Sequence, residues 1–435
     1  MSNTLPPIAV GLMGTGEYTT GITPSGQSKS DKKIGVVAVT MFDLKRRGKV
    51  SEVVMAGTNG GKFPEIKAHF QKNIGDVYKG LDLSFRGFPE GDLCDAEAYK
   101  SALKALPKGS AVIIFTPDST HFPIASEALN LGHHVLVTKP ATQKLEDHQK
   151  LIDLAADKGL VCMVEHHKRF DPAYNDARAR AQKLGDFNFY SSYMSQPKFQ
   201  LETFKSWAGI DSDISYYLNS HHIDIHCWMV EGRFHPTKVT ASASKGIAET
   251  LGCDPKTEDT ITLLVDWQSY ENPEKRGTAV YTASWAAPLK AGVHSEQRFH
   301  YMAAKGEVRV DQAHRGYSVV EDDVGKLDYN PFYVKYSPDE DGFFDGQVSA
   351  HLAVNPQLMV IFQRGYGYLS LEKFIDAATE VSNGRRTAES YEGKGLPTIA
   401  DTVLTTAILH AGRVSLDEKR TVGLEEVSSG KWKLV

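Results

Sequence analysis

Hydrophobic positions in the first 165 residues form short apolar runs separated by longer amphipathic stretches. This alternation is typical of a parallel sheet covered by helices, because each strand is buried on both faces and each helix on one. The expected strands are Ile8–Met13, Glu52–Ala56, Ala111–Thr116, His134–Thr138 and Val161–Glu165. The expected helices are Ile34–Arg47, Phe63–Gln71, Pro123–Leu131 and Leu145–Lys158. We therefore expect a doubly wound α/β domain over residues 1–166.

The pattern changes after about Pro172. One helical stretch around residues 217–228 precedes four β-type runs, which are Lys238–Ala243, Asp259–Trp267, Thr278–Trp285 and Glu307–Asp311. Helical spacing returns at Ser370–Ser382 and Pro397–Arg413. These features predict a second domain over residues 167–435, of the α+β class and built on a largely antiparallel open sheet, for substrate binding and oligomerisation.

Composition narrows the classes of partner. The 435 residues exceed what one hydrophobic core usually supports, and the net charge of -5 gives no basic field for nucleic acid. No apolar run reaches the roughly 18–20 residues that span a bilayer, so we expect no membrane partner. The four cysteines lack CxxC spacing, which is typical of reduced thiols and favours a cytoplasmic location.

A glycine pair follows the first expected strand, in the sequence IAVGLMGTGEYTTG. Glycine at Gly14 and Gly16 allows a tight turn and a close approach to a pyrophosphate, which the amides of the following residues meet. We assign Gly14, Thr15, Gly16, Glu17 and Tyr18 to dinucleotide binding in a Rossmann fold. Thr19 stands where a third glycine is usual, and the alternative interpretation is a plain turn after an edge strand.

The second strand leads into GTNGGK without the carboxylate that commonly bonds the ribose 2′-hydroxyl. Thr58 and Asn59 offer hydrogen bonds to a hydroxyl or a phosphate, and Lys62 offers a charge for a 2′-phosphate. We expect NAD or NADP as cofactor, with a slight preference for NADP. The alternative is that Asn59-Gly60-Gly61 is a simple turn beside a solvated lysine.

Two polar clusters follow the third and fourth expected strands. Thr116, Pro117, Asp118 and His121 belong to the first cluster, and Lys139 precedes Pro140 in the second. Ligands of open α/β sheets bind outside the carboxyl ends of the strands, so both clusters are expected at the cofactor crevice. A proline after Lys139 keeps that lysine out of helical conformation and gives its side chain a defined origin.

Taken in order, these elements resemble the Gfo/Idh/MocA family, named after glucose-fructose oxidoreductase, inositol dehydrogenase and the rhizopine protein MocA. The matching segments are IAVGLMGTG, FTPDSTHFPIASEALNLGHHVLVTKP, KRFDPAY, YLNSHHID and LPTIADTVLTTAILHAGRVSLDEKRTV. The resemblance spans nearly the whole chain. It implies an NAD(P)-dependent oxidoreductase that acts on a CH–OH group of a sugar or polyol, and it implies a homodimer or homotetramer.

The resemblance also implies roles for individual residues. Lys139 corresponds to the lysine of the family's E-K-P motif, which contacts substrate and nicotinamide, although Thr138 replaces the glutamate. His221 matches the histidine of the D-x-G-x-H segment, the usual acid/base residue. Tyr217 replaces the aspartate of that segment and Asn219 its glycine, so we expect the phenol of Tyr217 to bond a substrate hydroxyl.

Hydride removal from an alcohol carbon requires that the hydroxyl proton leave, and a histidine near neutrality suits that task. A nearby lysine cation would stabilise alkoxide character. Tyr217, His221 and Asp224 are spaced four and three apart, so one α-helix would present all three on one face. We therefore expect Lys139, His221 and Tyr217 to be catalytic.

Further candidates follow the fifth strand. His167 and Asp224 are expected to contact substrate together with Lys139, Tyr217 and His221. Arg169 is expected to contact the nucleotide, with a salt bridge at the domain junction as the alternative. His222 and His226 lie four apart, but no third ligand with suitable spacing follows, so we expect no metal.

Two other functions stay open at this point. One is a regulator that binds NAD(P) without turnover, which retention of both Lys139 and His221 disfavours. The other is a glycosidase that keeps its NAD permanently bound. Cofactor that survives desalting without net nicotinamide reduction would identify the glycosidase.

Overall fold

A computed structural model describes residues 5–23, 26–28, 32–78, 80–332 and 365–435. The chain forms two compact units. Unit 1 takes its described residues from Met1–Ala141, Lys150–His167 and Ala353–Asp401, and unit 2 takes its described residues from Thr142–Gln149, Lys168–Leu352 and Thr402–Val435. The chain passes from unit 1 to unit 2 after His167, next to the expected division after residue 166. The later stretch 365–401 belongs to unit 1 again.

Unit 1 is built on a six-stranded sheet in the order β5-β4-β1-β6-β7-β8, and every pairing in it is parallel. Its strands are β1 (Ile8–Met13), β4 (Val50–Ala56), β5 (Arg86–Phe88), β6 (Ala111–Ile114), β7 (His134–Thr138) and β8 (Cys162–Glu165). The chain leaves β1 toward β4 and β5 and then places β6 on the other side of β1. This reversal confirms the predicted doubly wound Rossmann sheet and creates a crevice where β1 and β6 end.

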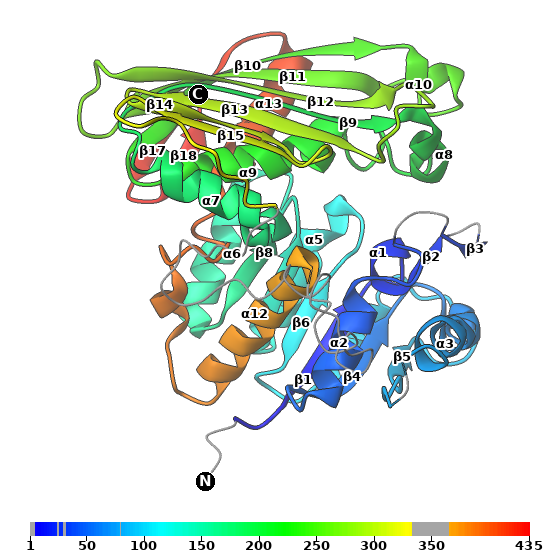
Figure 1. The fold of residues 1–435 in the computed structure, drawn as a ribbon. Helices are drawn as coiled ribbons and strands as arrows, with labels where there is room; N and C mark the ends of the chain where they lie inside the picture. Colours follow the sequence, from blue (N-terminus) through cyan, green and yellow to red (C-terminus); the bar gives the residue numbers. More distant parts are fainter. Residues whose placement is uncertain (1–4, 24–25, 29–31, 79, 333–364) are drawn as a thin grey trace. The chain divides into compact units, whose positions relative to one another are not determined.

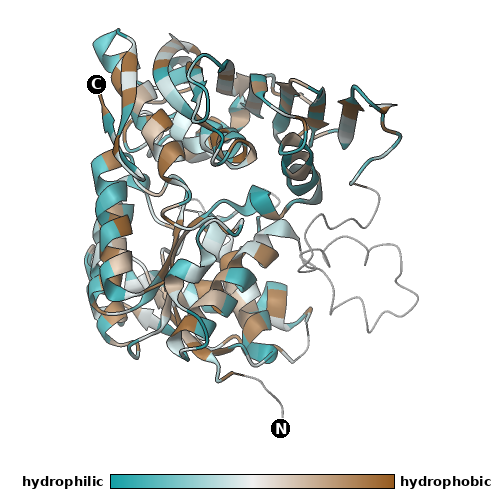
Figure 2. Cartoon of the chain, turned by 90° about the vertical axis from the view of Figure 1, so that its left-hand side faces the viewer, coloured by the Kyte–Doolittle hydropathy of each residue, from teal (hydrophilic) through white to brown (hydrophobic). Residues whose placement is uncertain are grey.

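Helices cover the sheet of unit 1. They are α1 (Glu17–Thr20), α2 (Val37–Arg46), α3 (Phe63–Phe70), α4 (Ala98–Lys104), α5 (His121–Asn130), α6 (Leu145–Lys158, which begins in unit 2) and α12 (Tyr366–Ser382). Helix α12 packs on α2, β1 and β8 (Figure 1). Both apolar and polar colours lie along these helices in Figure 2, as expected for helices with one buried face.

Short elements complete unit 1. They are β2 (Ile22–Thr23), β3 (Gly26–Gln27), η1 (Gly60–Lys62), the π-helical η2 (Gln71–Gly75), η3 (Asp118–Thr120), η4 (His167–Phe170, which passes into unit 2) and η8 (Ala388–Tyr391). Two predicted boundaries were wrong. The helix expected from Ile34 begins at Val37, because Gly35 has a φ of +75°. The helix expected from Pro397 begins at Val403, because residues 397–399 are extended and hydrogen-bond to Cys162 and Val164 of β8.

Unit 2 contains a ten-stranded sheet in the order β16-β15-β14-β13-β9-β12-β11-β10-β17-β18. Only β9 and β12 pair in parallel among the pairings described for this sheet. The strands are β9 (Phe187–Pro197), β10 (Phe234–Lys245), β11 (Glu258–Ser269), β12 (Arg276–Ala287), β13 (Glu296–Ala303), β14 (Gly306–Asp311), β15 (Gly316–Glu321), β16 (Gly325–Lys326), β17 (Val422–Ser428) and β18 (Lys431–Leu434). The largely antiparallel sheet of the α+β prediction is confirmed.

One face of this sheet is buried and the other is open. The helical elements of unit 2 are α7 (Pro172–Ala181), η5 (Lys198–Gln200), α8 (Leu201–Phe204), the π-helical η6 (Ser215–Asn219), α9 (Ser220–Met229), α10 (Ile247–Thr250) and α13 (Val403–Glu418). Trp267, Tyr281 and Trp285 fill the buried face, where α13 packs on β10 and on α9. Successive residues of β11 point to opposite faces of the sheet, so that Leu263 is buried while Leu264 is 44% exposed. The open face therefore exposes apolar as well as polar side chains.

Candidate functional site

The carboxyl ends of β1 and β6 approach closely at the first glycine. Gly14 has a φ of +108°, and a Cβ at this position would lie 2.0 Å from the carbonyl oxygen of Phe115. Its amide donates to the carbonyl of Ala56 at the end of β4 (2.9 Å). Glycine is required here both by the backbone angle and by the packing.

The second glycine borders open space. Gly16 is extended, and a Cβ added to it would meet nothing within 4 Å. Its carbonyl accepts the amides of Thr19 and Thr20 (3.1 and 2.9 Å) in the helical turn α1. This turn lies just after the glycines, where the sequence analysis placed no helix before Ile34. The exposed backbone beside Gly16 fits the close approach of a pyrophosphate.

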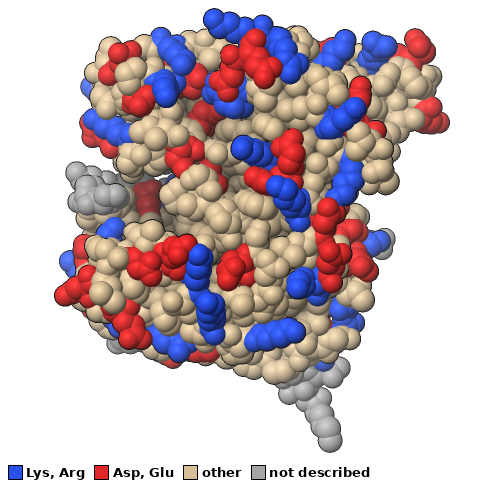
Figure 3. Space-filling model, turned by 180° about the vertical axis from the view of Figure 1, so that it is seen from behind, with Lys and Arg blue, Asp and Glu red and all other residues tan. Residues whose placement is uncertain are grey.

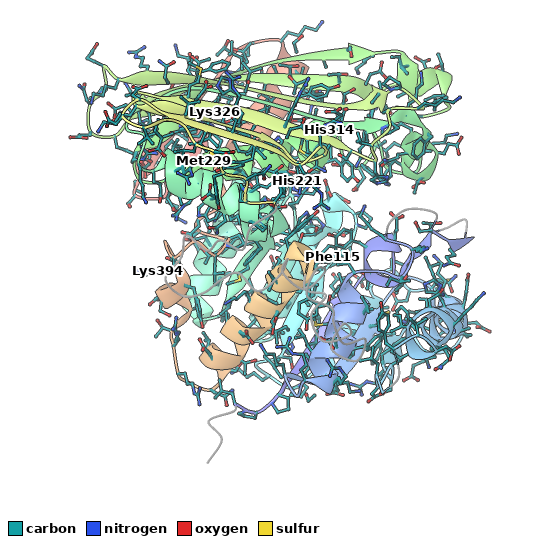
Figure 4. All side chains as sticks on the ribbon, viewed as in Figure 1. Phe115, His221, Met229, His314, Lys326 and Lys394 are labelled. Carbon is teal, nitrogen blue, oxygen red and sulfur yellow. The ribbon has the colours of Figure 1, made fainter. Side chains whose placement is uncertain are left out.

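Side chains on α1 are tied to neighbouring loops. Tyr18 stacks on Phe115, with ring centroids 4.9 Å apart and planes 7° apart; Phe115 is labelled in Figure 4. Lys32 places its Nζ 5.8 Å from the centre of the Tyr18 ring. Glu17 accepts a hydrogen bond from the hydroxyl of Ser28. The carboxylate of Glu17 and the ring of Tyr18 thus stabilise the turn that contains the two glycines.

The turn after β4 is closed by its own asparagine. Asn59 accepts the amide of Gly61 through its side-chain oxygen (2.9 Å), and the carbonyl of Thr58 accepts the amide of Asp95 (2.9 Å). Lys62 is exposed at the end of η1. A nearby carboxylate was not predicted from the sequence, because Asp92 comes from the loop after β5. Its Oδ1 would lie 3.4 Å from a Cβ at Gly61. The Asp92 carboxylate and the Lys62 ammonium are thus both present where the adenosine ribose is expected.

His121 joins the loops that follow β6 and β7. Its ring is buried, with Nε2 2.9 Å from the carbonyl oxygen of Thr116 and Nδ1 2.8 Å from that of Pro140. Thr120 donates its hydroxyl to the hydroxyl of Thr116 (2.7 Å) and to the carbonyl of Pro117 (2.7 Å). In this position the His121 ring links the backbone of Thr116 to that of Pro140, next to Lys139.

Lys139 is half-buried at the end of β7. Burial lowers the pKa of its ammonium to about 8, and the carboxylates of Asp118 and Glu165 oppose that decrease. Glu165 ends the neighbouring strand, where it pairs in register with Thr138. A lysine with a pKa near neutrality is suited to proton transfer, which requires both protonation states to be accessible.

His167 extends this group of ionisable side chains. Its Nδ1 lies 2.8 Å from Oε2 of Glu165, and its ring stacks on Tyr366 at the start of α12, with centroids 5.3 Å apart. Glu165 and Tyr366 were not among the predicted site residues. Nothing local in the sequence pairs residue 167 with residue 366, since the contact depends on the return of the chain to unit 1.

In unit 2, the segment with Tyr217 and His221 is not one regular α-helix. Residues Ser215–Asn219 form the π-helical turn η6, and α9 begins at Ser220. The predicted common face assumed one α-helix for Tyr217, His221 and Asp224, whereas the structure places only His221 and Asp224 on α9. The ring of Tyr217 contacts Phe204 and Trp207, each with centroids 5.3 Å away, while His221 is 8% exposed on α9 (Figure 4).

Arg169 and Asp224 form a buried ion pair. Nε and Nη2 of Arg169 donate to the two carboxylate oxygens of Asp224 at 2.8 and 2.6 Å. Both residues belong to unit 2, so the salt bridge that we considered as the alternative role of Arg169 lies within one unit. The bidentate pair fixes α9 against η4 and thereby fixes the helix that contains His221.

The other histidines of α9 are core residues. His222 approaches the hydroxyl of Tyr174 (3.1 Å), and His226 stacks on Tyr190 with centroids 4.3 Å apart. Burial lowers the pKa of both imidazoles well below the ordinary value. Across the described ranges, no three His, Cys, Asp or Glu side chains are grouped so as to hold a metal ion.

Surface charge and helix hydropathy are relevant to nucleic-acid and membrane partners. On the face shown in Figure 3, basic and acidic side chains are interspersed. Among the residues that the structure describes, no helix has the length and hydropathy needed to cross a membrane.

A known family matches part of the chain that forms the parallel sheet. Residues 84–166 match a family model described as "Oxidoreductase family, NAD-binding Rossmann fold". This match contains β6, β7 and β8, and therefore the segments on which Thr116, His121 and Lys139 lie.

Two curated relatives are dehydrogenases of Bacillus subtilis. The chain is 35% identical over 122 residues to scyllo-inositol 2-dehydrogenase (NAD(+)), a match that covers 26% of this chain and 36% of the relative. It is 29% identical over 154 residues to scyllo-inositol 2-dehydrogenase (NADP(+)) IolW, covering 33% of this chain and 41% of the relative. These matches thus span about two fifths of the relatives' length or less.

Solved structures match over the whole chain. An inositol dehydrogenase homolog from Azotobacter vinelandii, complexed with NADH and myo-inositol, covers 96% of this chain, and the match takes in 97% of that protein. The TM-score is 0.68 and the sequence identity 16%. Likeness at this identity establishes the two-part fold.

Proposed function

We propose that this chain is an oxidoreductase of the Gfo/Idh/MocA family that transfers a hydride between a nicotinamide cofactor and a hydroxyl-bearing carbon of a sugar or polyol, because its residues 84–166 match that family's NAD-binding model. One observation carries this proposal. The glycine turn after β1 opens beside Gly16, and a lysine with a pKa of about 8 stands at the same carboxyl edge of the parallel sheet. An open α/β sheet binds its ligands along this edge.

The residues of unit 1 fit a dinucleotide. The backbone from Gly14 to Tyr18 would receive the pyrophosphate, and the 58–62 turn would receive the adenosine ribose. The nicotinamide, when bound, accepts or gives the hydride. We keep a slight preference for NADP on the basis of exposed Lys62, with Asp92 as the group that favours an unphosphorylated ribose.

Three side chains are assigned to the reacting substrate. An imidazole nitrogen of His221 takes the proton of the substrate hydroxyl, and the Lys139 ammonium stabilises the negative charge that develops on that oxygen. Tyr217 bonds a neighbouring hydroxyl through its phenol. His167, held by Glu165 and Tyr366, is assigned to substrate at the end of β8.

The direct test is a screen of sugars and polyols with NAD and with NADP, read by the near-ultraviolet absorbance of reduced nicotinamide. We expect reduction with at least one polyol of the inositol type. Cofactor binding without turnover on any of these compounds would support the regulator instead. Cofactor that stays bound through desalting, together with cleavage of a glycoside and no net reduction, would support the glycosidase.

We also propose that the protein assembles as a homodimer or homotetramer through the open face of the unit 2 sheet. That face carries the half-exposed side chains Thr262, Leu264, Val280 and Thr282 at its centre, on β11 and β12. A second copy would present the same surface, as a two-fold interface requires. The mixture of apolar and hydroxyl-bearing side chains is suited to such contact.

A further inference from the structure

The helical segment that carries Tyr217 and His221 begins at a buried aspartate. Oδ1 of Asp213 accepts the amides of Ser215 (2.8 Å) and Tyr216 (2.9 Å), and its carbonyl accepts the amide of Tyr217 (3.0 Å). The first amides of a helix have no partner within the helix, so a carboxylate placed here satisfies them. Asp213 therefore fixes the position of the first turn.

An arginine on α13 fixes the other oxygen of this carboxylate. Arg413 donates through Nη1 to Oδ2 of Asp213 and to Oε1 of Glu258 on β11, both at 3.2 Å. Its remaining nitrogens bind Asp417 at 2.6 and 3.1 Å, and Lys245 of β10 lies 3.4 Å from Glu258. The charged groups around Asp213 thus come from α13, β10 and β11.

The loop before Asp213 is folded against the ring of Tyr217. The carbonyl of Trp207 accepts the amide of Asp211 (2.8 Å), and the hydroxyl of Thr257 donates to the carbonyl of Ala208 (3.0 Å). The Trp207 ring meets the Tyr217 ring at 62°. A movement of the first turn would consequently change the surroundings of Trp207.

We propose that Asp213, held by Arg413, is a positioning residue that sets the orientation of Tyr217 and His221 toward substrate. This inference rests on the proposed function of those two side chains. Asp213 acts through the helix start, since its carboxylate accepts hydrogen bonds from two backbone amides and a guanidinium.

The position of Asp213 makes this anchor sensitive to pH. The pKa of its carboxyl is raised from 3.8 to about 6, chiefly by burial and also by Glu258, although the Tyr216 amide and Arg413 oppose the increase. The folded chain thus holds the proton more tightly than the unfolded chain, so the stabilisation by the neutral form is lost as pH rises from about 4 to about 6. Below about 6 the protein gains that proton and loses the ion pair with Arg413.

Trp207 supplies a readout that does not depend on turnover. All five tryptophans lie within the described ranges, and Trp207 is the one that is not buried. Its quenching by iodide is measured between about pH 5 and pH 7 in wild type, Asp213→Asn and Asp213→Ala. Asparagine keeps an oxygen for the two amides and removes the charge, whereas alanine removes both. Asp186→Asn, an exposed carboxylate paired with Lys275, is the matched control.

We expect a transition near pH 6 in wild type and in Asp186→Asn, and none in Asp213→Asn. The KM for the polyol should rise about fivefold in Asp213→Ala, the size of a lost helix cap, with less change in Asp213→Asn and unchanged cofactor affinity. A transition that persists in Asp213→Asn, or a wild-type KM in Asp213→Ala, would overturn the proposal. Absence of polyol turnover in wild type would instead refute the proposed function, and the quenching data would still decide the role of Asp213.

Discussion

Charged residues at the carboxyl edge of unit 1 differ in burial, and this decides what each can do. Lys139 is half-buried, and its lowered pKa suits proton transfer. Lys62 is exposed and belongs to a turn that Asn59 closes, so its charge remains available to an anion in solvent. Asp92 brings a negative charge to the same turn. Cofactor choice depends on which of these two charges lies nearer the ribose 2′ position.

Replacing these two residues separates the cofactors. Lys62→Ala should weaken the binding of NADP by the roughly 1.5–3 kcal/mol of a charged hydrogen bond and leave the binding of NAD nearly unchanged. Asp92→Asn should have the opposite effect and strengthen the binding of NADP relative to that of NAD. The dissociation constants are measured by titration of nicotinamide fluorescence. Equal losses for NAD and NADP in Lys62→Ala would show that Lys62 does not contact a 2′-phosphate.

Individual residues were predictable from sequence where their surroundings are local. Gly14, His121 and Lys139 lie within a few positions of strand ends that the hydrophobic pattern defines. The contacts of His167 with Tyr366 and of Arg169 with Asp224 join positions far apart in the chain. No spacing rule relates such positions, so their pairing could be found only in the folded structure.

At the scale of elements, the glycine turn depends on two residues with different constraints. Gly14→Ala should destabilise the fold by at least about 1–3 kcal/mol, because the new Cβ would clash with Phe115 at a positive φ. Gly16→Ala should leave stability nearly unchanged, since its Cβ enters open space, but should weaken the binding of the dinucleotide. Denaturant unfolding and cofactor titration measure the two effects. Equal destabilisation by both variants would contradict the described turn.

Long periodic elements were predicted well and irregular ones were not. Strands β1 and β7 and helix α6 have the predicted bounds. Strand β9 was missed because its sequence, FNFYSSYMSQP, contains few aliphatic residues, although Tyr190 and Met194 are buried. The π-turn before α9 was missed because Asp213 and Asn219 shape it through side-chain hydrogen bonds. Spacing alone does not reveal such bonds.

At the scale of the whole molecule, the chain does not divide at a single point. Residues 365–401 return to unit 1, where Lys49 binds Glu372 and Asp376 of α12 (both 2.7 Å). A boundary inferred from one change in pattern near residue 166 cannot show such a return. The open sheet of unit 2 was predictable from the alternation of its strands, and its role in assembly remains a prediction.

That role is tested by Leu264→Glu. Leu264 is 44% exposed on β11, so a charge there should spare the folded subunit and weaken contact with a second copy. Light scattering should give two or four times 47.9 kDa for wild type and about 47.9 kDa for the variant. Val324→Glu, 65% exposed beyond β15, is the control and should keep the wild-type mass. A wild-type mass in Leu264→Glu would place any interface elsewhere.

The proposed reaction is a hydride transfer in which Lys139 assists at the substrate oxygen. The measurement is the rate of nicotinamide reduction with the best polyol in wild type, Lys139→Ala and Lys158→Ala, with cofactor affinity determined alongside. The exposed Lys158 at the end of α6 is the matched lysine control. We expect Lys139→Ala to reduce turnover at least about a hundredfold with nearly unchanged cofactor binding, and Lys158→Ala to resemble wild type. Wild-type turnover in Lys139→Ala would contradict it.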